Sequence, residues 1–265
     1  MNKLFFIGIF CALLVSCNSK KEDSNEMEEV LAPNESSAAY KLESEIEKNI
    51  AETDLNDKLE IMNSLYFTKE DESTIEVVAF LGKNQEIAKL EEKYNDVAEN
   101  RNGTNLFYIK KGKKYASKER FEDRTTKKIM FVERVTFYDK NEKAITSKIR
   151  KAEFEEDIEA VPFTFIKAYD CSSKRAMEVI NQEGAFQPFF QGIIINGRDK
   201  FITIGESKED GYISALMIQY YNSTTDTMLK NQMKCLGRKL DIDYQKITDD
   251  TGFEFQLLLR VNFAK

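Results

Sequence analysis

FYIKKGKKYASKER at residues 107–120 and FYDKNEKAITSKIR at residues 137–150 are two copies of one pattern, thirty residues apart. Each copy has an aromatic start, a Lys-rich turn with Gly or Asn, and a returning segment that ends in Ser-Lys-x-Arg. An apolar segment, a polar turn and a second segment of similar length are typical of an antiparallel β-hairpin. A shorter relative covers residues 80–89. The repeat therefore predicts a meander of antiparallel hairpins.

Basic side chains are concentrated in this meander. Residues 106–151 hold 15 basic and 6 acidic side chains, whereas residues 18–105 hold 10 basic and 22 acidic ones. Alternate residues of a strand share a face, so the Lys and Arg of each Ser-Lys-x-Arg end point the same way. Stacked hairpins would then form a basic ribbon, and the candidate anion-binding residues are Lys110, Lys113, Lys118, Arg120, Lys140, Lys143, Lys148 and Arg150.

Two interpretations of the ribbon follow from these charges. An exposed ribbon would bind phosphate or sulfate groups of an anionic envelope polymer, or an acidic protein. Alternatively, the acidic segment that precedes it neutralises the ribbon within the same molecule. Nucleic acid is not an expected partner, because the C-terminal segment 152–265 is itself acidic, with 13 basic and 18 acidic side chains.

Helical periodicity precedes the hairpins. Ser36 or Ser37 can cap a first helix, and Asp54 can cap a second. Apolar residues at 3/4 spacing give each helix one face: Ala39, Leu42, Ile46 and Ile50 in the first, and Leu55, Leu59, Met62 and Leu65 or Tyr66 in the second. We expect a helix pair that packs on the following sheet.

After the hairpins, the sequence predicts a strand at residues 161–166 and a helix that begins at Cys171-Ser172-Ser173, with Ala176, Val179 and Ile180 on one face.

The last eighty residues have a different order of elements. Strands are expected at residues 189–196, 200–205 and 211–221, followed by a helix at 225–236 and strands at 239–248 and 253–263. Three strands, a helix and two strands resemble the OB-fold, a small barrel found in exported bacterial proteins. The expected class is thus α+β, mainly antiparallel β, with an N-terminal helix pair, a hairpin meander and a C-terminal OB-like small barrel.

The N-terminal residues predict an export signal. Lys3 is followed by an apolar run over residues 4–15 and then by Ser16 and Cys17. The run is too short to span a membrane, which takes roughly 20 residues. Its end, Leu14-Val15-Ser16-Cys17, resembles the lipobox of bacterial lipoproteins. That resemblance implies cleavage before Cys17, acylation of Cys17 and attachment to the outer membrane.

The residues after the lipobox predict how the protein is displayed. Residues 17–36 are polar and without periodicity, as expected of a flexible tether. Lys21-Glu22-Asp23 resembles the surface-export signal of Bacteroidota-type lipoproteins and favours the outer face over the periplasmic face. The expected organisation is a signal peptide (1–16), the tether (17–36), a helix-plus-hairpin domain (37–166) and an OB-like domain (167–265).

Two cysteines remain in the body of the mature chain, Cys171 and Cys235. Cys11 leaves with the signal, and Cys17 would carry lipid. An even pair in an exported protein can form a disulfide, because that compartment is oxidising. The alternative is two buried thiols.

Enzyme chemistry has little support in the sequence. The chain has no His, which removes the commonest general base and the His-paired nucleophiles. We name no catalytic residue, metal ligand or cofactor. The favoured function is a non-enzymatic, lipid-anchored binding or interaction module of the cell envelope. The alternative is an enzyme that uses carboxylates alone on glycans or small molecules at the cell surface.

Overall fold

The structure is a computed structural model that describes residues 33–125, 128–208 and 210–264. The expected signal peptide, the lipobox residue Cys17 and most of the tether lie outside these residues. Antiparallel strands predominate in the described part and helices are few, so the expected α+β class with mainly antiparallel β-structure is confirmed.

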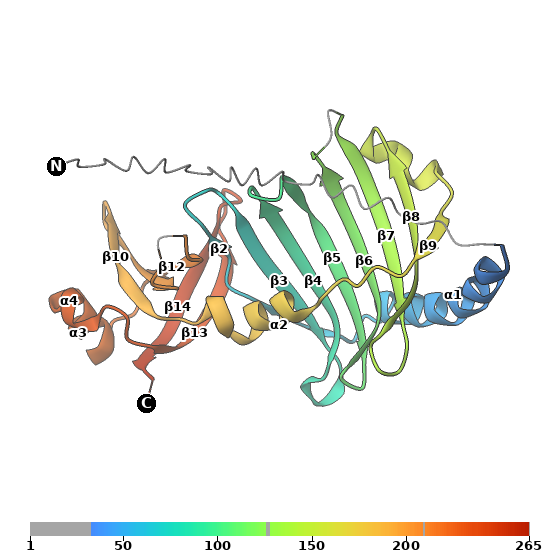
Figure 1. The fold of residues 1–265 in the computed structure, drawn as a ribbon. Helices are drawn as coiled ribbons and strands as arrows, with labels where there is room; N and C mark the ends of the chain where they lie inside the picture. Colours follow the sequence, from blue (N-terminus) through green and yellow to red (C-terminus); the bar gives the residue numbers. More distant parts are fainter. Residues whose placement is uncertain (1–32, 126–127, 209, 265) are drawn as a thin grey trace, which may run out of the picture.

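Most strands belong to one path, β10-β11-β12-β2-β3-β4-β5-β6-β7-β8-β9, which Figure 1 shows from one end of the molecule to the other. The first nine strands are β1 (Glu60–Asn63), β2 (Phe67–Thr68), β3 (Thr74–Leu81), β4 (Ile87–Asp96), β5 (Arg101–Lys110), β6 (Lys113–Asp123), β7 (Met130–Tyr138), β8 (Ala144–Ala152) and β9 (Thr164–Lys167). The C-terminal strands are β10 (Phe190–Asn196), β11 (Asp199–Gly205), β12 (Ile213–Ile218), β13 (Leu240–Thr248) and β14 (Glu254–Phe263).

Helices are placed between and before these strands. The α-helices are α1 (Pro33–Asp54), α2 (Lys174–Asn181), α3 (Ser223–Lys230) and α4 (Gln232–Cys235). Short 3-10 helices are η1 (Lys83–Gln85), η2 (Glu155–Ala160) and η3 (Gly184–Phe186). The expected helix at 225–236 is thus divided into α3 and α4. Asn222 fixes the start of α3, because its side chain accepts hydrogen bonds from the Thr224 and Thr225 amides at 2.9 Å.

Both copies of the sequence repeat form hairpins, β5–β6 and β7–β8. In the first, Lys111 and Gly112 both have positive φ (53° and 72°), which suits a two-residue turn between twisted strands. In the second, the Asp139 carboxylate accepts hydrogen bonds from the amides of Asn141 (2.7 Å) and Lys143 (3.0 Å). Each returning strand then contains an extra residue, Tyr115 or Ile145, at the register shifts next to Tyr108 and Tyr138. The repeat therefore includes a β-bulge at equivalent positions.

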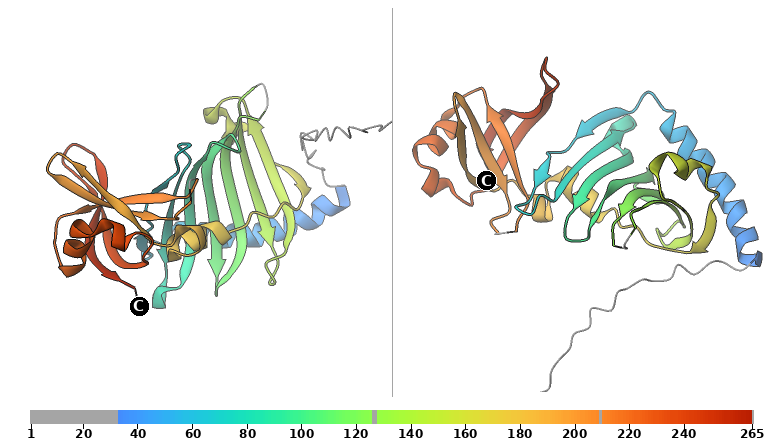
Figure 2. Two further views of the ribbon diagram at one scale, coloured as in Figure 1. Left: turned by 60° about the vertical axis from the view of Figure 1, so that its left-hand side comes forward. Right: turned by 90° about the horizontal axis from the view of Figure 1, so that it is seen from above.

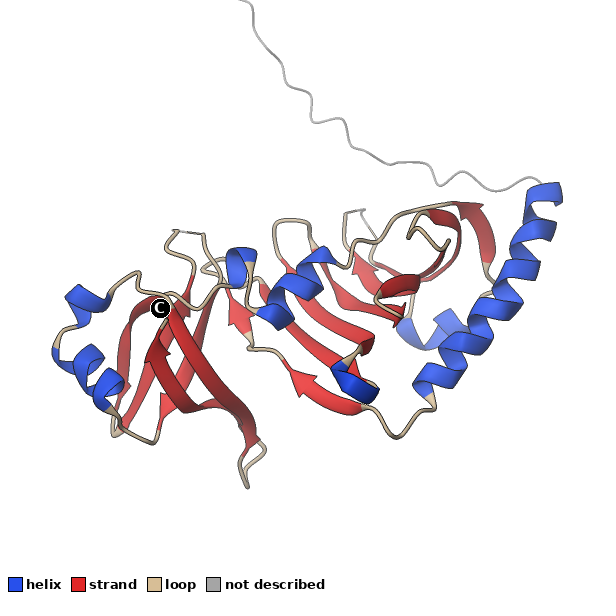
Figure 3. Ribbon diagram, turned by 90° about the horizontal axis from the view of Figure 1, so that it is seen from below, coloured by secondary structure: helices blue, strands red, loops and turns tan. Residues whose placement is uncertain are grey.

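Two helices cover opposite faces of the meander, as Figures 2 and 3 show. On the α1 face, Ile46 is buried and packs with Tyr108, Phe137 and Phe165. On the α2 face, Ala176, Val179 and Ile180 are buried, as the sequence periodicity predicted. The two faces exist because successive side chains of each strand point in opposite directions.

The C-terminal strands share a core with the start of the meander. Val77 of β3, Val179 of α2, and Ile204 and Leu258 of the C-terminal strands belong to one buried cluster. In the same cluster the rings of Phe67 and Phe186 meet edge-to-face, 5.1 Å apart. Full burial of such a side chain contributes about 2–3 kcal/mol, so this cluster joins the two regions firmly.

The pairing of the C-terminal strands includes a parallel contact. β12 pairs antiparallel with β11 but parallel with β14, and β14 pairs antiparallel with β13. The Phe190 amide donates to the Arg238 carbonyl, and the Leu240 amide donates to the Pro188 carbonyl, each at 2.9 Å. These bonds connect the start of β10 to the start of β13.

The prediction of a second helix after α1 is wrong. α1 ends at Asp54. After it, two residues of the expected apolar stripe are exposed, Leu55 to 83% and Met62 to 38%, so the apolar spacing is not used to bury a helical face. The segment instead forms β1, which pairs antiparallel with β3, and it buries Leu65 and Phe67 in the core. This segment forms a strand because the β3 backbone groups on that side would otherwise have no partners, and pairing with β1 satisfies their hydrogen bonds.

Two further boundaries differ from the expected ones. α1 begins at Pro33, before Ser36 and Ser37, and proline is well suited to the first turn of a helix. The strand expected at residues 161–166 is displaced to β9, Thr164–Lys167. Pro162 lacks the amide that strand pairing requires, which accounts for the later start.

Candidate functional site

Three of the eight candidate anion-binding cations converge on one carboxylate, that of Glu133 in β7. The side chain of Glu133 is 1% exposed and lies 2.8 Å from Lys118 Nζ, 3.1 Å from Arg120 Nη2 and 2.7 Å from Arg150 Nη2. Arg120, Glu133 and Arg150 are direct cross-strand neighbours on β6, β7 and β8. We call these four residues the Glu133 cluster.

The Glu133 carboxylate is strongly stabilised in its ionised form. Burial by itself would raise the pKa of Glu133, since removal from water disfavours the charge. The hydrogen bonds and charges of Lys118, Arg150 and Arg120 outweigh burial and lower the pKa of Glu133 to about 2. The cluster therefore holds a permanent negative charge among three cations, two of which remain partly exposed to solvent.

Lys148 is neutralised from a different element, the helix α1. Its ammonium contacts the carboxylates of both Glu43 and Glu47, and it lies 4.5 Å from the centre of the Phe163 ring. The lysine side chain is only 5% exposed, whereas those of Glu43 and Glu47 are 22% and 50% exposed. The acidic N-terminal segment thus supplies counter-charges to the meander.

The other four cations lie at the hairpin turns. Lys110 Nζ donates to Asn49 Oδ1 at 2.8 Å, and Lys113 Nζ donates to the Lys140 carbonyl at 2.9 Å. Lys140 and Lys143 are exposed in the β7–β8 turn. The structure therefore brings Lys118, Arg120, Lys148 and Arg150 together with carboxylates and keeps the turn lysines apart from them. Anion binding by these residues stays a prediction.

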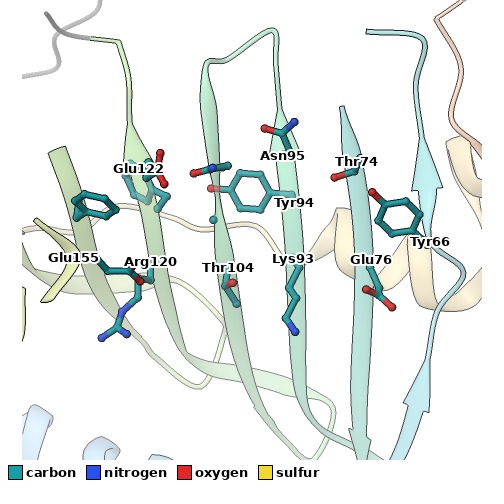
Figure 4. A pocket seen from close by; sticks show the side chains of 14 residues that line it. Tyr66, Thr74, Glu76, Lys93, Tyr94, Asn95, Thr104, Arg120, Glu122 and Glu155 are labelled. Carbon is teal, nitrogen blue, oxygen red and sulfur yellow. The ribbon is translucent and has the colours of Figure 1, made fainter. Parts of the chain in front are cut away.

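Beside the Glu133 cluster, the α1 face carries an open pocket of about 520 Å³. Cross-strand pairing orders most of its lining in two parallel rows. One row consists of Glu76, Lys93, Thr104 and Arg120, and the other of Thr74, Asn95, Asn102 and Glu122. Figure 4 shows both rows, with Tyr66 at the β3 end and Glu155 at the opposite end.

The charges of the pocket are mostly compensated by neighbours. Glu76 forms an ion pair with Lys246 of β13 at 2.7 Å, and Lys93 lies 3.3 Å from Glu91. Arg120 belongs to the Glu133 cluster and also lies 3.2 Å from Glu159. Its Nε is buried, and among the described residues it has no hydrogen-bond partner. The pocket thus offers hydrogen-bonding groups of both kinds without a strong net charge.

Sequence reasoning did not identify this pocket. Glu76, Lys93, Thr104 and Arg120 come from four different strands and form no local motif. Strand register was the signal that could have found them, since it places these four side chains side by side. The bulge at Tyr115 hides that register, because one extra residue changes which side chains face each other.

A second group of polar side chains is buried on the α2 face. Asn105 donates to Glu92 at 2.7 Å, Arg175 donates to Glu92 at 2.8 Å, and Arg134 donates to Glu119 at 3.4 Å. Burial raises the pKa of Glu119, although Arg134 opposes the shift. The segment between β9 and α2 closes this group off, with the Tyr169 ring 3.8 Å from the Arg134 guanidinium. The group therefore positions that segment.

Cys171 and Cys235 are free cysteines in the structure, and both are buried. The disulfide, one of the two expectations, is therefore not formed here, and the alternative of two buried thiols describes the structure. Burial raises the pKa of the Cys171 thiol, and the charges of Glu119 and Glu92 add to the shift. A protonated, covered thiol reacts slowly.

Comparison with known proteins leaves the function to the geometry of the site. No protein-family model, curated protein or solved structure shows a significant match to the chain. In the part of the chain that the structure describes, no helix is both long and apolar enough to cross a membrane. That part also contains no group of three or more His, Cys, Asp or Glu side chains suited to a metal ion.

Proposed function

We propose that this protein is a lipid-anchored binding module of the cell envelope, held at Cys17 in the outer membrane and facing outward. The observation that carries the binding function is the open pocket on the α1 face, with its two rows of hydrogen-bonding side chains. The lipobox and Lys21-Glu22-Asp23 support the address. Non-enzymatic binding is favoured because Glu76 and Arg120, the charged ends of one row, are engaged by Lys246 and Glu133.

We further propose that residues 167–265 form an OB-like barrel and that residues 37–166 form the helix-plus-hairpin domain. The pairing order β10-β11-β12-β14-β13 supports the barrel. The parallel β12–β14 contact and the bridge between Phe189 and Lys239 support it as well. Closure of this kind removes exposed strand edges.

The address is tested by changing Cys17 to Ala. We expect the variant to leave the membrane fraction or to accumulate as an unprocessed precursor, because acyl chains provide the anchor. Membrane attachment and normal processing in the variant would contradict the proposal. Protease treatment of intact cells then distinguishes the outer face from the periplasmic face.

Binding is tested with the full chain, purified in a detergent without a sugar headgroup. Its thermal unfolding is followed with lipopolysaccharide, envelope polysaccharide fractions, peptides and short oligosaccharides, because a ligand of the folded state raises the melting temperature. We expect stabilisation that Tyr66→Ala reduces and Tyr220→Ala preserves. Tyr66 is 43% exposed at the pocket, and Tyr220, the matched control, is 68% exposed on the C-terminal part.

Two results would overturn this function. Stabilisation by no member of the panel, or stabilisation that Tyr66→Ala leaves unchanged, removes the pocket as a binding site. Conversion of a ligand during incubation would favour the carboxylate-based enzyme, and loss of that conversion on changing Glu76 to Gln would establish it.

A further inference from the structure

The two rows of the pocket run across the strands, not along them. Neighbouring strands lie about 4.8 Å apart, so the four steps from β3 to β7 span about 19 Å. Tyr66 lies at the β3 end of this span and Glu155 of η2 at the other (Figure 4). Phe131 of β7, the cross-strand partner of Glu122, also lies at that other end. A ligand that contacts both ends is an extended chain with polar groups at intervals of about 5 Å.

Both rows combine hydrogen-bond donors and acceptors. The first row offers an acceptor at Glu76, a donor at Lys93, a hydroxyl at Thr104 and a donor at Arg120. The second row offers the Thr74 hydroxyl, two amides that both donate and accept, and the carboxylate of Glu122. A hydroxyl group also donates and accepts, so a chain of hydroxyls can satisfy every position. A polyanion would meet a carboxylate in each row, at Glu76 and Glu122, and a polycation would meet Lys93 and Arg120 in the first row.

The floor of the pocket disfavours an extended peptide. β3 to β7 are paired on both sides, so their backbone groups are already engaged and no strand can be added from above. The exposed aromatic side chain Tyr66 and the half-buried Phe131 lie at the two ends of the lining, and the residues of the two rows between them are polar. Aromatic rings in these positions can instead stack on the apolar faces of sugar rings.

We propose, on the basis of the proposed function, that the pocket binds a neutral linear oligosaccharide that lies across β3 to β7. Tyr66 and Phe131 stack on its terminal rings. Lys93, Thr104 and Arg120 bond its hydroxyls in between. This binding does not require any enzymatic step by the protein.

The proposal is tested by calorimetry on the full chain in the same sugar-free detergent. The probes are neutral gluco-, xylo- and chitooligosaccharides of about one to six units, oligogalacturonate as an acidic chain, and a mixed-charge peptide. Affinity should rise with length to about four units, the number that fits about 19 Å at one unit per strand step, and then level off. It should change less than about twofold between low and moderate salt, because neutral ligands are not screened.

Variants locate the bound chain. Tyr66→Ala and Thr104→Val should each weaken binding about tenfold, with Tyr220→Ala unchanged. Unchanged unfolding of each variant without ligand confirms that the fold is intact. Stronger, salt-sensitive binding of oligogalacturonate, or preference for the peptide, overturns the neutral glycan and retains the binding function. Absence of binding to every probe in this and the thermal panel overturns both.

Discussion

Arg150 Nη2 lies 2.7 Å from the Glu133 carboxylate, directly across the β7–β8 ladder, at a carboxylate that is 1% exposed. Lys118 and Arg120 contact the same carboxylate from β6. All three cations therefore share the Glu133 carboxylate as a counter-ion on this face. Its removal takes away the counter-ion that the three cations share and leaves Arg120 with the exposed Glu159. Such loss of compensation is costly where water is excluded.

Glu133→Gln should lower the free energy of unfolding by about 3 kcal/mol at neutral pH. Glu159→Gln is the matched control, because Glu159 contacts the same Arg120 but is 75% exposed. Exposed ion pairs contribute at most about 1 kcal/mol, so the control should change little. Urea unfolding of the full chain measures both, and equal effects of the two changes would contradict the role of Glu133.

Acid should remove the contribution of Glu133 in a defined pH range. The folded-state pKa is lowered to about 2 from 4.5, so the unfolded chain binds the proton first as the pH falls. The stabilisation is present above about pH 4.5 and is lost progressively toward pH 2, on the order of 3 kcal/mol in total. The difference in unfolding free energy between wild type and Glu133→Gln should shrink over this range. A constant difference would show that Glu133 is not the titrating group.

The hairpin repeat was predictable because its signals are local. Aromatic starts, turn residues and the thirty-residue offset appear in the sequence, and the same offset relates the bulge residues Tyr115 and Ile145. The stripe of α2 was predictable for the same reason, since Ala176, Val179 and Ile180 share one helical face. The order of the C-terminal strands also follows from turns and apolar segments that lie close together along the chain.

Contacts between residues far apart in the chain determine the features that the sequence patterns did not predict. Residues 55–66 have helical spacing, but β3 offers an unpaired edge and the core accepts Leu65 and Phe67, so tertiary contacts override the periodicity. The pocket depends on the register of five strands, and one bulge is enough to change it. Glu133 has no distinctive sequence context, and only pairing with β6 and β8 reveals its three partners.

Cys171 and Cys235 should be unreactive in the folded protein. Both thiols are buried, and the pKa of Cys171 is raised by burial and by nearby carboxylates, so little thiolate forms at neutral pH. Alkylation of freshly isolated material, followed by mass mapping without reductant, should label neither thiol before unfolding and both after it. A pair that resists labelling in denaturant and is released by reductant would establish the disulfide instead.

The stability of the contact between α1 and the sheet should fall more when the two acids of α1 are changed than when Lys148 of β8 is changed. Lys148 is 5% exposed, whereas Glu43 and Glu47 are 22% and 50% exposed. Changing both acids to Gln leaves the buried Lys148 ammonium without a counter-charge from α1. This should lower the free energy of unfolding by about 3 kcal/mol. Lys148→Met fills a similar volume and leaves two acids that water reaches, so about 1 kcal/mol is expected.

The triple variant, with both acids changed to Gln and Lys148 to Met, distinguishes charge from packing. If the unpaired Lys148 charge causes the loss of stability in the double variant, adding Lys148→Met should restore much of that stability, because no unpaired charge remains. Amide exchange in residues 43–54 should follow the same order, fastest in the double variant and slower again in the triple. A triple variant less stable than the double would show that Glu43, Glu47 and Lys148 hold α1 by their shape and not by their charge.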